Sequence, residues 1–175
     1  MKLTLFVFVK ESEKETFINY MKNLRPNFKN QKGFNLIELM IVIAIIALLI
    51  AIGVPAYQSM VKNGNEVSAI QSIQNIKTLQ VGYAGKHQGK FAPSFDEMIK
   101  SVQLDERFAG EAPVVNGYIF KMTVQESSGS KPSSYAINAD PQTGSGTRHF
   151  YFDSTLGTTK STEEDRPATA TDPSI

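Results

Sequence analysis

The chain has 175 residues, a formal net charge of +1 and no cysteine. This length suits one modest domain together with an additional segment. The near-neutral balance lacks the strong positive charge with which nucleic-acid-binding proteins neutralise phosphates. Without cysteine the protein forms no disulfide and no thiolate site, so its stability has to come from packing and hydrogen bonds.

Basic residues are concentrated at the amino terminus. Residues 1–33 carry seven Lys or Arg against three Glu, whereas residues 34–175 carry eleven basic against fourteen acidic residues. We interpret residues 1–33 as a basic leader, which the positive-inside tendency keeps in the cytoplasm while the rest crosses the membrane. All three glutamates of this segment precede Met21. Translation from Met21 and a long leader from Met1 therefore stay open as alternatives.

A long apolar run follows the leader. The eighteen residues 39–56 contain no charged side chain, and as a helix they span about 27 Å, close to the apolar thickness of a bilayer. We predict a transmembrane and assembly helix over residues 34–57. Glu38 lies near its start, although a charge well inside hydrocarbon costs roughly 3 kcal/mol. The carboxylate either snorkels to the interface or has a specific partner.

The helix is predicted to continue beyond the membrane to about Ala84. Apolar residues recur there at every third position, which gathers them on one face of a helix: Val67, Ile70, Ile73, Ile76 and Leu79. Pro55 removes a backbone donor and, together with Gly53, predicts a kink in the helix. The Asn63-Gly64-Asn65 segment predicts a second bend.

Residues 58–157 are predicted to form a small exported domain. Ser94 and Glu97 have the spacing of a capping box, which predicts a short helix ending near Val102. Alternating apolar residues predict three strands, over residues 118–125, 134–139 and 148–153. The expected fold class is α+β, a three-stranded antiparallel meander packed on the carboxyl-terminal half of the long helix. The remaining residues 158–175 are rich in Thr, Ser, Pro and acids and are predicted to be a flexible polar tail.

The segment Lys32-Gly33-Phe34-Asn35-Leu36-Ile37-Glu38, followed by the apolar run, resembles the class III signal of type IV pilins and of the pseudopilins of type II secretion. The resemblance implies that a prepilin peptidase cuts between Gly33 and Phe34 and that Phe34 becomes the N-methylated first residue. It also implies that Glu38 pairs with the amine of Phe34 in an adjacent subunit during assembly. Asn35 departs from the Thr most often seen at its position.

The same resemblance implies a structural protein, not an enzyme, with a pilin fold. Its partners would be further copies of itself in a filament, the prepilin peptidase, the inner-membrane assembly platform and its ATPase, and the cytoplasmic membrane. Before assembly it would be a single-pass inner-membrane protein, and afterwards part of an extracellular pilus filament serving adhesion, motility or DNA uptake. A major pseudopilin and a signal-anchored exported binding protein are the alternatives.

Other chemistry has little support in the sequence. His87 and His149 have no evident catalytic partner, and neither a cofactor site nor a metal site is expected. The adjacent acids Glu163, Glu164 and Asp165 fit a solvated surface better than a cation site. Lys86 and Lys90, with the aromatic residues Tyr83 and Phe91 nearby, form a patch too small for strong nucleic-acid binding.

Overall fold

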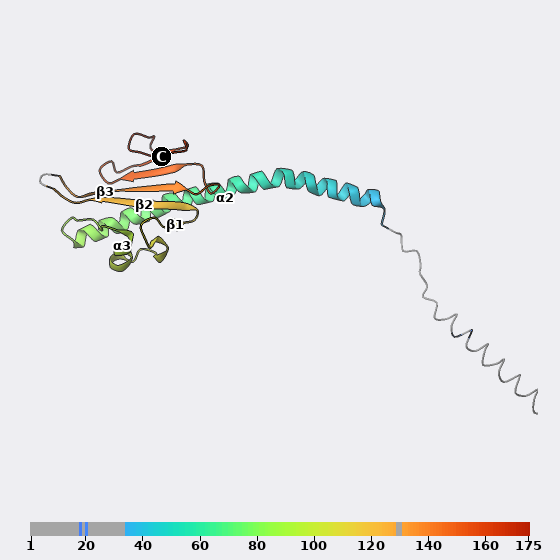
Figure 1. The fold of residues 1–175 in the computed structure, drawn as a ribbon, viewed down its shortest axis with the longest axis horizontal. Helices are drawn as coiled ribbons and strands as arrows, with labels where there is room; N and C mark the ends of the chain where they lie inside the picture. Colours follow the sequence, from blue (N-terminus) through green and yellow to red (C-terminus); the bar gives the residue numbers. More distant parts are fainter. Residues whose placement is uncertain (1–17, 19, 21–33, 129–130) are drawn as a thin grey trace, which may run out of the picture. The chain divides into compact units, whose positions relative to one another are not determined.

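The computed structural model describes residues 18, 20, 34–128 and 131–175. The helices are α2 (Leu36–Lys86), α3 (Phe95–Val102) and the 3-10 helix η1 (Glu106–Phe108). The strands are β1 (Val114–Val115), β2 (Tyr118–Gln125), β3 (Ser134–Pro141), β4 (His149–Asp153) and β5 (Thr159–Thr162). They form one antiparallel sheet in the order β1-β2-β3-β4-β5, so that each strand pairs with its neighbour in the sequence. Figure 1 shows the sheet alongside the green, carboxyl-terminal part of α2.

The predicted long helix is confirmed. It continues two residues beyond the expected end near Ala84, to Lys86. Pro55 and Gly53 both lie within α2, as does the Asn63-Gly64-Asn65 segment. The kink and the bend expected at these positions stay predictions.

Helix α3 begins where the sequence predicts. The hydroxyl of Ser94 accepts a hydrogen bond of 3.2 Å from the backbone N–H of Glu97, which satisfies one of the free donors of the first turn. Glu97 accepts from the Ser101 hydroxyl at 2.5 Å, one turn further along. Gln103 ends the helix in the left-handed conformation, and its N–H donates to the Met98 carbonyl.

The sheet has five strands, so the expectation of three was wrong. Strands β2, β3 and β4 were predicted from their alternating apolar residues, and β1 and β5 are the additional edge strands. Strand β1 has two residues, and β5 reads Thr-Lys-Ser-Thr without a large apolar side chain. Two residues are too few to show an alternation, and an edge strand of polar residues carries no hydrophobic pattern. Strand β5 also lies inside the segment predicted to be a tail.

The core lies between α2 and one face of the sheet. Fully buried side chains come from one face of α2 and from alternate positions of the strands, and they include Ile73, Ile76, Tyr118, Phe120, Ile137 and Phe150. Val67, which the three-residue spacing placed on the same helix face, is instead 52% exposed. Helix α3 and η1 add Met98 and Phe108, and the Phe108 and Phe120 rings meet edge to face at 5.1 Å. Complete burial of one such side chain contributes about 1.5 to 3 kcal/mol.

A buried carboxylate ties α2 to the loop before β4. The side chain of Glu66 is 5% exposed and accepts from the Arg148 Nε at 2.8 Å and from the Thr147 N–H at 3.0 Å. Burial alone would raise the pKa of the Glu66 carboxyl, but these hydrogen bonds outweigh it and hold the pKa below its ordinary value. The neighbouring Asn65 donates its side-chain amide to the Ser145 carbonyl at 2.8 Å. The loop is therefore fixed to the helix by polar contacts.

A second polar contact fixes the chain between α2 and α3. Gln80 is fully buried, and its amide bonds both backbone groups of Ala92, accepting from the N–H at 2.9 Å and donating to the carbonyl at 3.1 Å. A buried amide satisfied in this way contributes about 1 kcal/mol per hydrogen bond and costs more when one partner is removed.

The last residues pack on the domain without a disulfide. Arg166 bonds Asp172 at 2.6 Å and Glu164 at 2.6 Å, which closes the terminal segment into a loop. Ala168 is buried, and its carbonyl accepts from the Asn138 side chain at 3.1 Å. These contacts hold part of the predicted tail against β3.

Candidate functional site: the amino-terminal assembly segment

The assembly segment, residues 34–57, contains the residues that the sequence singles out for processing and polymerisation. Gly33, the candidate start at Met21 and all of the leader except residues 18 and 20 lie outside the described residues. Phe34 is described, precedes the helix and is 76% exposed. The bond predicted to be cut therefore joins an undescribed residue to an exposed, non-helical one, and cleavage and N-methylation stay predictions.

Asn35 is the amino-terminal cap of α2. Its side-chain oxygen accepts from the Ile37 N–H at 3.1 Å, while its carbonyl accepts from the Glu38 N–H at 3.0 Å. Helix ends leave four backbone donors without partners, and Asn is among the residues that satisfy them best. The sequence analysis missed this role, although the Asn-x-x-Glu spacing of Asn35 and Glu38 is close to that of a capping box.

Glu38 lies in the first turn of α2. The amino end of a helix carries a partial positive charge, and an acid there stabilises the helix by about 0.3 to 1 kcal/mol. This local effect gives Glu38 a reason to lie at the start of the helix within its own chain. It is smaller than the roughly 3 kcal/mol that a charge inside hydrocarbon costs. The helix end therefore offsets part of the cost and leaves room for a further partner.

The apolar side chains of the assembly segment are exposed all around the helix. Leu36 is 73% exposed and Ile52 67%, and every residue from Phe34 to Tyr57 falls in the exposed class. Within the described part of the chain, α2 is the one helix long and apolar enough to cross a membrane. A monomeric soluble protein rarely leaves an apolar surface of this extent in water. The segment is built to be covered by lipid or by protein.

Gly53 and Pro55 interrupt the otherwise aliphatic composition of this helix. A side chain at Gly53 would meet nothing within 4 Å, so the packing of the described chain does not require glycine there. Pro55 cannot donate to the carbonyl four residues earlier, at Ala51. The free carbonyl weakens α2 locally, which is the physical basis of the kink that stays a prediction.

The two histidines have structural partners. The His87 Nδ1 lies 2.8 Å from the Tyr83 carbonyl, and the two rings stack at 3.8 Å. The His149 Nδ1 lies 2.7 Å from the Asp140 carboxylate across the β3–β4 pair. Sequence reasoning missed the partner of His149 because nine residues and a turn separate the two. Both histidines are held by hydrogen bonds within the domain.

The aromatic residues of the suspected nucleic-acid patch belong to the domain interior. Tyr83 is buried beneath His87, and Phe91 packs edge to face on Tyr135 at 4.6 Å. Rings held in this way are not free to stack on bases. Both aromatic residues therefore serve the packing of the domain.

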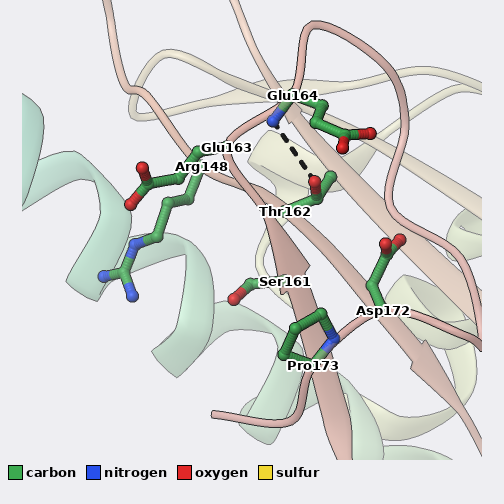
Figure 2. A pocket seen from close by; sticks show the side chains of 7 residues that line it. All are labelled: Arg148, Ser161, Thr162, Glu163, Glu164, Asp172 and Pro173. Carbon is green, nitrogen blue, oxygen red and sulfur yellow. Dashed lines mark hydrogen bonds between the residues drawn. The ribbon is translucent and has the colours of Figure 1, made fainter.

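Three acidic residues near the carboxyl terminus, Glu163, Glu164 and Asp172, line a hollow of about 580 Å³ beside β5, and Asp165 is not among its lining residues. Figure 2 shows the carboxylates of Glu163 and Glu164 pointing in different directions, with Asp172 apart from both. The backbone N–H of Glu164 donates to the Thr162 hydroxyl at 3.2 Å, and the Glu164 carboxylate is paired with Arg166. Within the described residues, these acids do not converge on a common point.

Comparison with known proteins finds similarity at the amino-terminal end. Residues 28–54 match the model of the family described as "Prokaryotic N-terminal methylation motif". The chain is 44% identical to "Prepilin peptidase-dependent protein D" of Escherichia coli (strain K12) over 59 residues, which is 34% of this chain and 40% of that protein. It is 44% identical to "Type IV major pilin protein PilE1" of Neisseria gonorrhoeae over 57 residues, 33% of this chain and 34% of that protein.

A longer match is to "Fimbrial protein EcpC" of Eikenella corrodens, 38% identical over 100 residues, or 57% of each chain. The chain therefore spans 34% to 57% of the length of these curated relatives. No solved structure matches.

Proposed function

We propose that the chain is a structural subunit of a type IV pilus-like filament, and its amino-terminal methylation motif and its similarity to a type IV major pilin and a prepilin peptidase-dependent protein support the proposal. In this proposal prepilin peptidase cuts between Gly33 and Phe34, and the apolar part of α2 drives polymerisation. The observation that carries the proposal is the assembly segment itself, an exposed apolar helix with one carboxylate, Glu38, in its first turn.

In this proposal the exposed apolar side chains of α2 are covered first by the membrane and later by the filament. In the membrane, lipid covers its side chains, and residues 58–175 lie outside the cytoplasm because the basic leader stays inside. In a filament, the same side chains are covered by the helices of neighbouring subunits. Helices packing in this way exchange lipid contact for protein contact, so polar groups decide the register between them.

Glu38 is the polar group available for that purpose. Cleavage after Gly33 creates a cationic amine at Phe34, and methylation of the amine keeps its charge. If this amine pairs with Glu38 of the adjacent subunit, two isolated charges in an apolar surrounding become one ion pair. Removal of one partner from a buried pair costs about 3 to 5 kcal/mol, because the other charge is left uncompensated. A subunit displaced by one turn loses that pair and is rejected.

The proposal assigns the partners as well. Prepilin peptidase processes the chain, an inner-membrane platform and its ATPase extract it from the cytoplasmic membrane, and further copies receive it at the base of the filament. Adhesion, motility and DNA uptake are functions of the finished filament. None of them requires a catalytic residue in this subunit.

The test is the incorporation of Glu38→Ala into filaments sheared from cells, with Glu126→Ala as the control because Glu126 is exposed in the turn after β2. We expect both variants to be processed at Phe34, which mass spectrometry of the amino terminus reads out. Only Glu38→Ala should be lost from the sheared fraction, by about a hundredfold for a pair worth about 3 kcal/mol.

The alternatives give different results. A major pseudopilin would stay in the cell envelope, and deletion of its gene would abolish secretion of exported proteins without removing surface filaments. A signal-anchored binding protein would stay monomeric, and Glu38→Ala would leave it unchanged. Incorporation of Glu38→Ala at the level of the control would overturn the proposed role of the carboxylate.

A further inference from the structure

The solvent-facing side of the sheet carries a hollow of about 430 Å³. It lies over the middle strands and is lined mainly by uncharged polar residues of β2, β3 and β4, together with two tyrosines and one carboxylate. Its lining residues include Thr123, Gln125, Ser134, Tyr135, Tyr151 and Asp153. Ligand pockets in proteins range from about 300 to 1,000 Å³. The volume is in the range expected for a small ligand of one or two rings.

Ala136 is the reason that the surface is hollow here. Tyr135 and Ile137 point into the core, so the side chain of Ala136 between them points to solvent. Its partners across the sheet are Thr123 on β2 and Asp153 on β4. A methyl group between longer side chains leaves a depression whose floor is the strand itself.

One wall of the hollow is held in place by a hydrogen-bonded group. The Tyr151 hydroxyl donates to the Asp153 carboxylate at 3.1 Å, so the Tyr151 side chain lies along the sheet toward Asp153. Thr155 donates to the same carboxylate from its N–H at 2.7 Å and from its hydroxyl at 2.6 Å. Burial would raise the pKa of Asp153, but these hydrogen bonds outweigh it and keep the pKa below its ordinary value. The ring and the carboxylate are thus fixed before a ligand arrives.

The opposite wall offers unused polar groups. Among the hydrogen bonds of the described residues, none involves the side chains of Thr123, Gln125 or Ser134. Two hydroxyls and one amide can therefore both donate to and accept from a ligand. Among the residues that line the hollow, Asp153 is the only charged one. Its carboxylate favours a ligand that donates hydrogen bonds and repels an anionic one.

From this arrangement we propose that the hollow is a binding site for a neutral pyranose ring of a glycan. Vicinal hydroxyls of a sugar can bond the amide, the hydroxyls and the carboxylate at once, while its apolar C–H face can pack on the Tyr151 ring. The inference does not depend on polymerisation, because the assembly segment contributes nothing to the hollow.

The test is saturation-transfer NMR on the full-length protein in a phosphocholine detergent, which contains no sugar. The probes are the methyl β-glycosides of galactose, glucose and N-acetylglucosamine, with methyl β-glucuronide as the anionic counterpart. We expect transfer to at least one neutral glycoside and a signal at least fivefold weaker for the glucuronide. Ala136→Leu, which fills the hollow from the solvent side, should reduce the neutral signal at least fivefold.

Ala109→Leu is the matched control, because Ala109 is exposed and lies outside the hollow. Tyr151→Phe keeps the ring but loses the hydroxyl that holds it toward Asp153, so it should weaken binding less than Tyr151→Ala, which should abolish it. Near-ultraviolet circular dichroism, which reports the packing of the tyrosines, verifies that each variant is folded. The proposal is overturned if no neutral glycoside receives transfer, or if a folded Ala136→Leu variant binds as well as Ala109→Leu.

Discussion

Helix α2 runs through both the assembly segment and the sheet domain, residues 62–175, but its side chains are exposed in the first and partly buried in the second. In the assembly segment every side chain is exposed and almost every one is apolar, so its partners have to come from outside the chain. In the sheet domain α2 turns a defined face inward, and its one buried carboxylate, Glu66, is satisfied by Arg148 and Thr147. A carboxylate on a helix is thus neutralised within the chain in one region and, by our proposal, between chains in the other.

The sequence comparisons divide the molecule in a similar way. The family model covers residues 28–54, which include most of the assembly segment. The stability of the sheet domain depends on its own packing, which many sequences can satisfy. The two regions should therefore respond independently to mutation.

The largest effect on the sheet domain should come from Phe120→Ala. Phe120 is fully buried against Phe108 and α2, and loss of a ring from such a site costs about 3 to 5 kcal/mol. Thermal unfolding of the full-length protein in detergent, followed by the near-ultraviolet signal, measures the loss. Val114→Ala at a half-exposed position is the control and should change stability by less than about 0.5 kcal/mol. A change in processing at Phe34 in the folded variant would contradict the independence of the two regions.

The second prediction concerns Glu66→Gln, which should destabilise the domain by about 2 to 3 kcal/mol at neutral pH through its charged hydrogen bonds. The folded-state pKa of Glu66 is lowered, so its contribution is present above the unfolded pKa of about 4.3 and is lost as the pH falls through the folded pKa. The difference between wild type and Glu66→Gln should therefore shrink below about pH 4.3. Glu126→Gln, at an exposed position, should show no such convergence.

A smaller effect is expected from Gly146→Ala. A Cβ at this position would overlap the Tyr118 hydroxyl, which donates to the Arg148 carbonyl at 2.9 Å. Displacing the ring should cost about 1 to 3 kcal/mol. Gly85→Ala is the opposite control, since nothing lies within 4 Å of the added carbon, and it should stabilise α2 by up to about 1 kcal/mol. Equal midpoints of thermal unfolding for the two variants would show that the loop before β4 is not fixed as described.

The smallest effect should come from Asn35→Ala in the assembly segment. Loss of the cap costs about 1 kcal/mol, which raises opening of the first turn about fivefold. Hydrogen exchange of the Ile37 amide in micelles measures this opening. Asn35→Thr should restore most of the protection, because a threonine hydroxyl also accepts at a cap. An unchanged exchange rate of the Ile37 amide in Asn35→Ala would show that the Asn35 side chain does not stabilise the first turn of α2.

The parts of the fold that the sequence predicts are those with a strong repeating pattern. The three-residue spacing of Ile70, Ile73 and Ile76 indicates the buried face of α2, and the alternation around Phe120 and Ile137 indicates β2 and β3. Strand β5 was missed because polar side chains in an edge strand give no alternation. Strand β5 is held to β4 by backbone hydrogen bonds, which do not require particular side chains and so could not be predicted from the residue types.

The functional residues also differ in whether the sequence could predict them. The candidate cleavage site and Glu38 follow from a contiguous motif, whereas Glu66 with Arg148 and Asp140 with His149 are pairs that only the folded chain brings together. The Asn35 cap was within reach of the sequence, because Asn followed three residues later by Glu marks a helix start. The hollow over Ala136 was not, since it requires the register of three strands.

The central claim is that Glu38 is neutralised by the amine of Phe34 in an adjacent subunit. A high-resolution electron cryomicroscopy structure of the filament tests it most directly. The account predicts the Glu38 carboxylate within about 4 Å of the Phe34 nitrogen of a neighbouring subunit, with Asn35 still capping its own helix. A filament in which Glu38 faces solvent, or contacts no neighbouring amine, would contradict it.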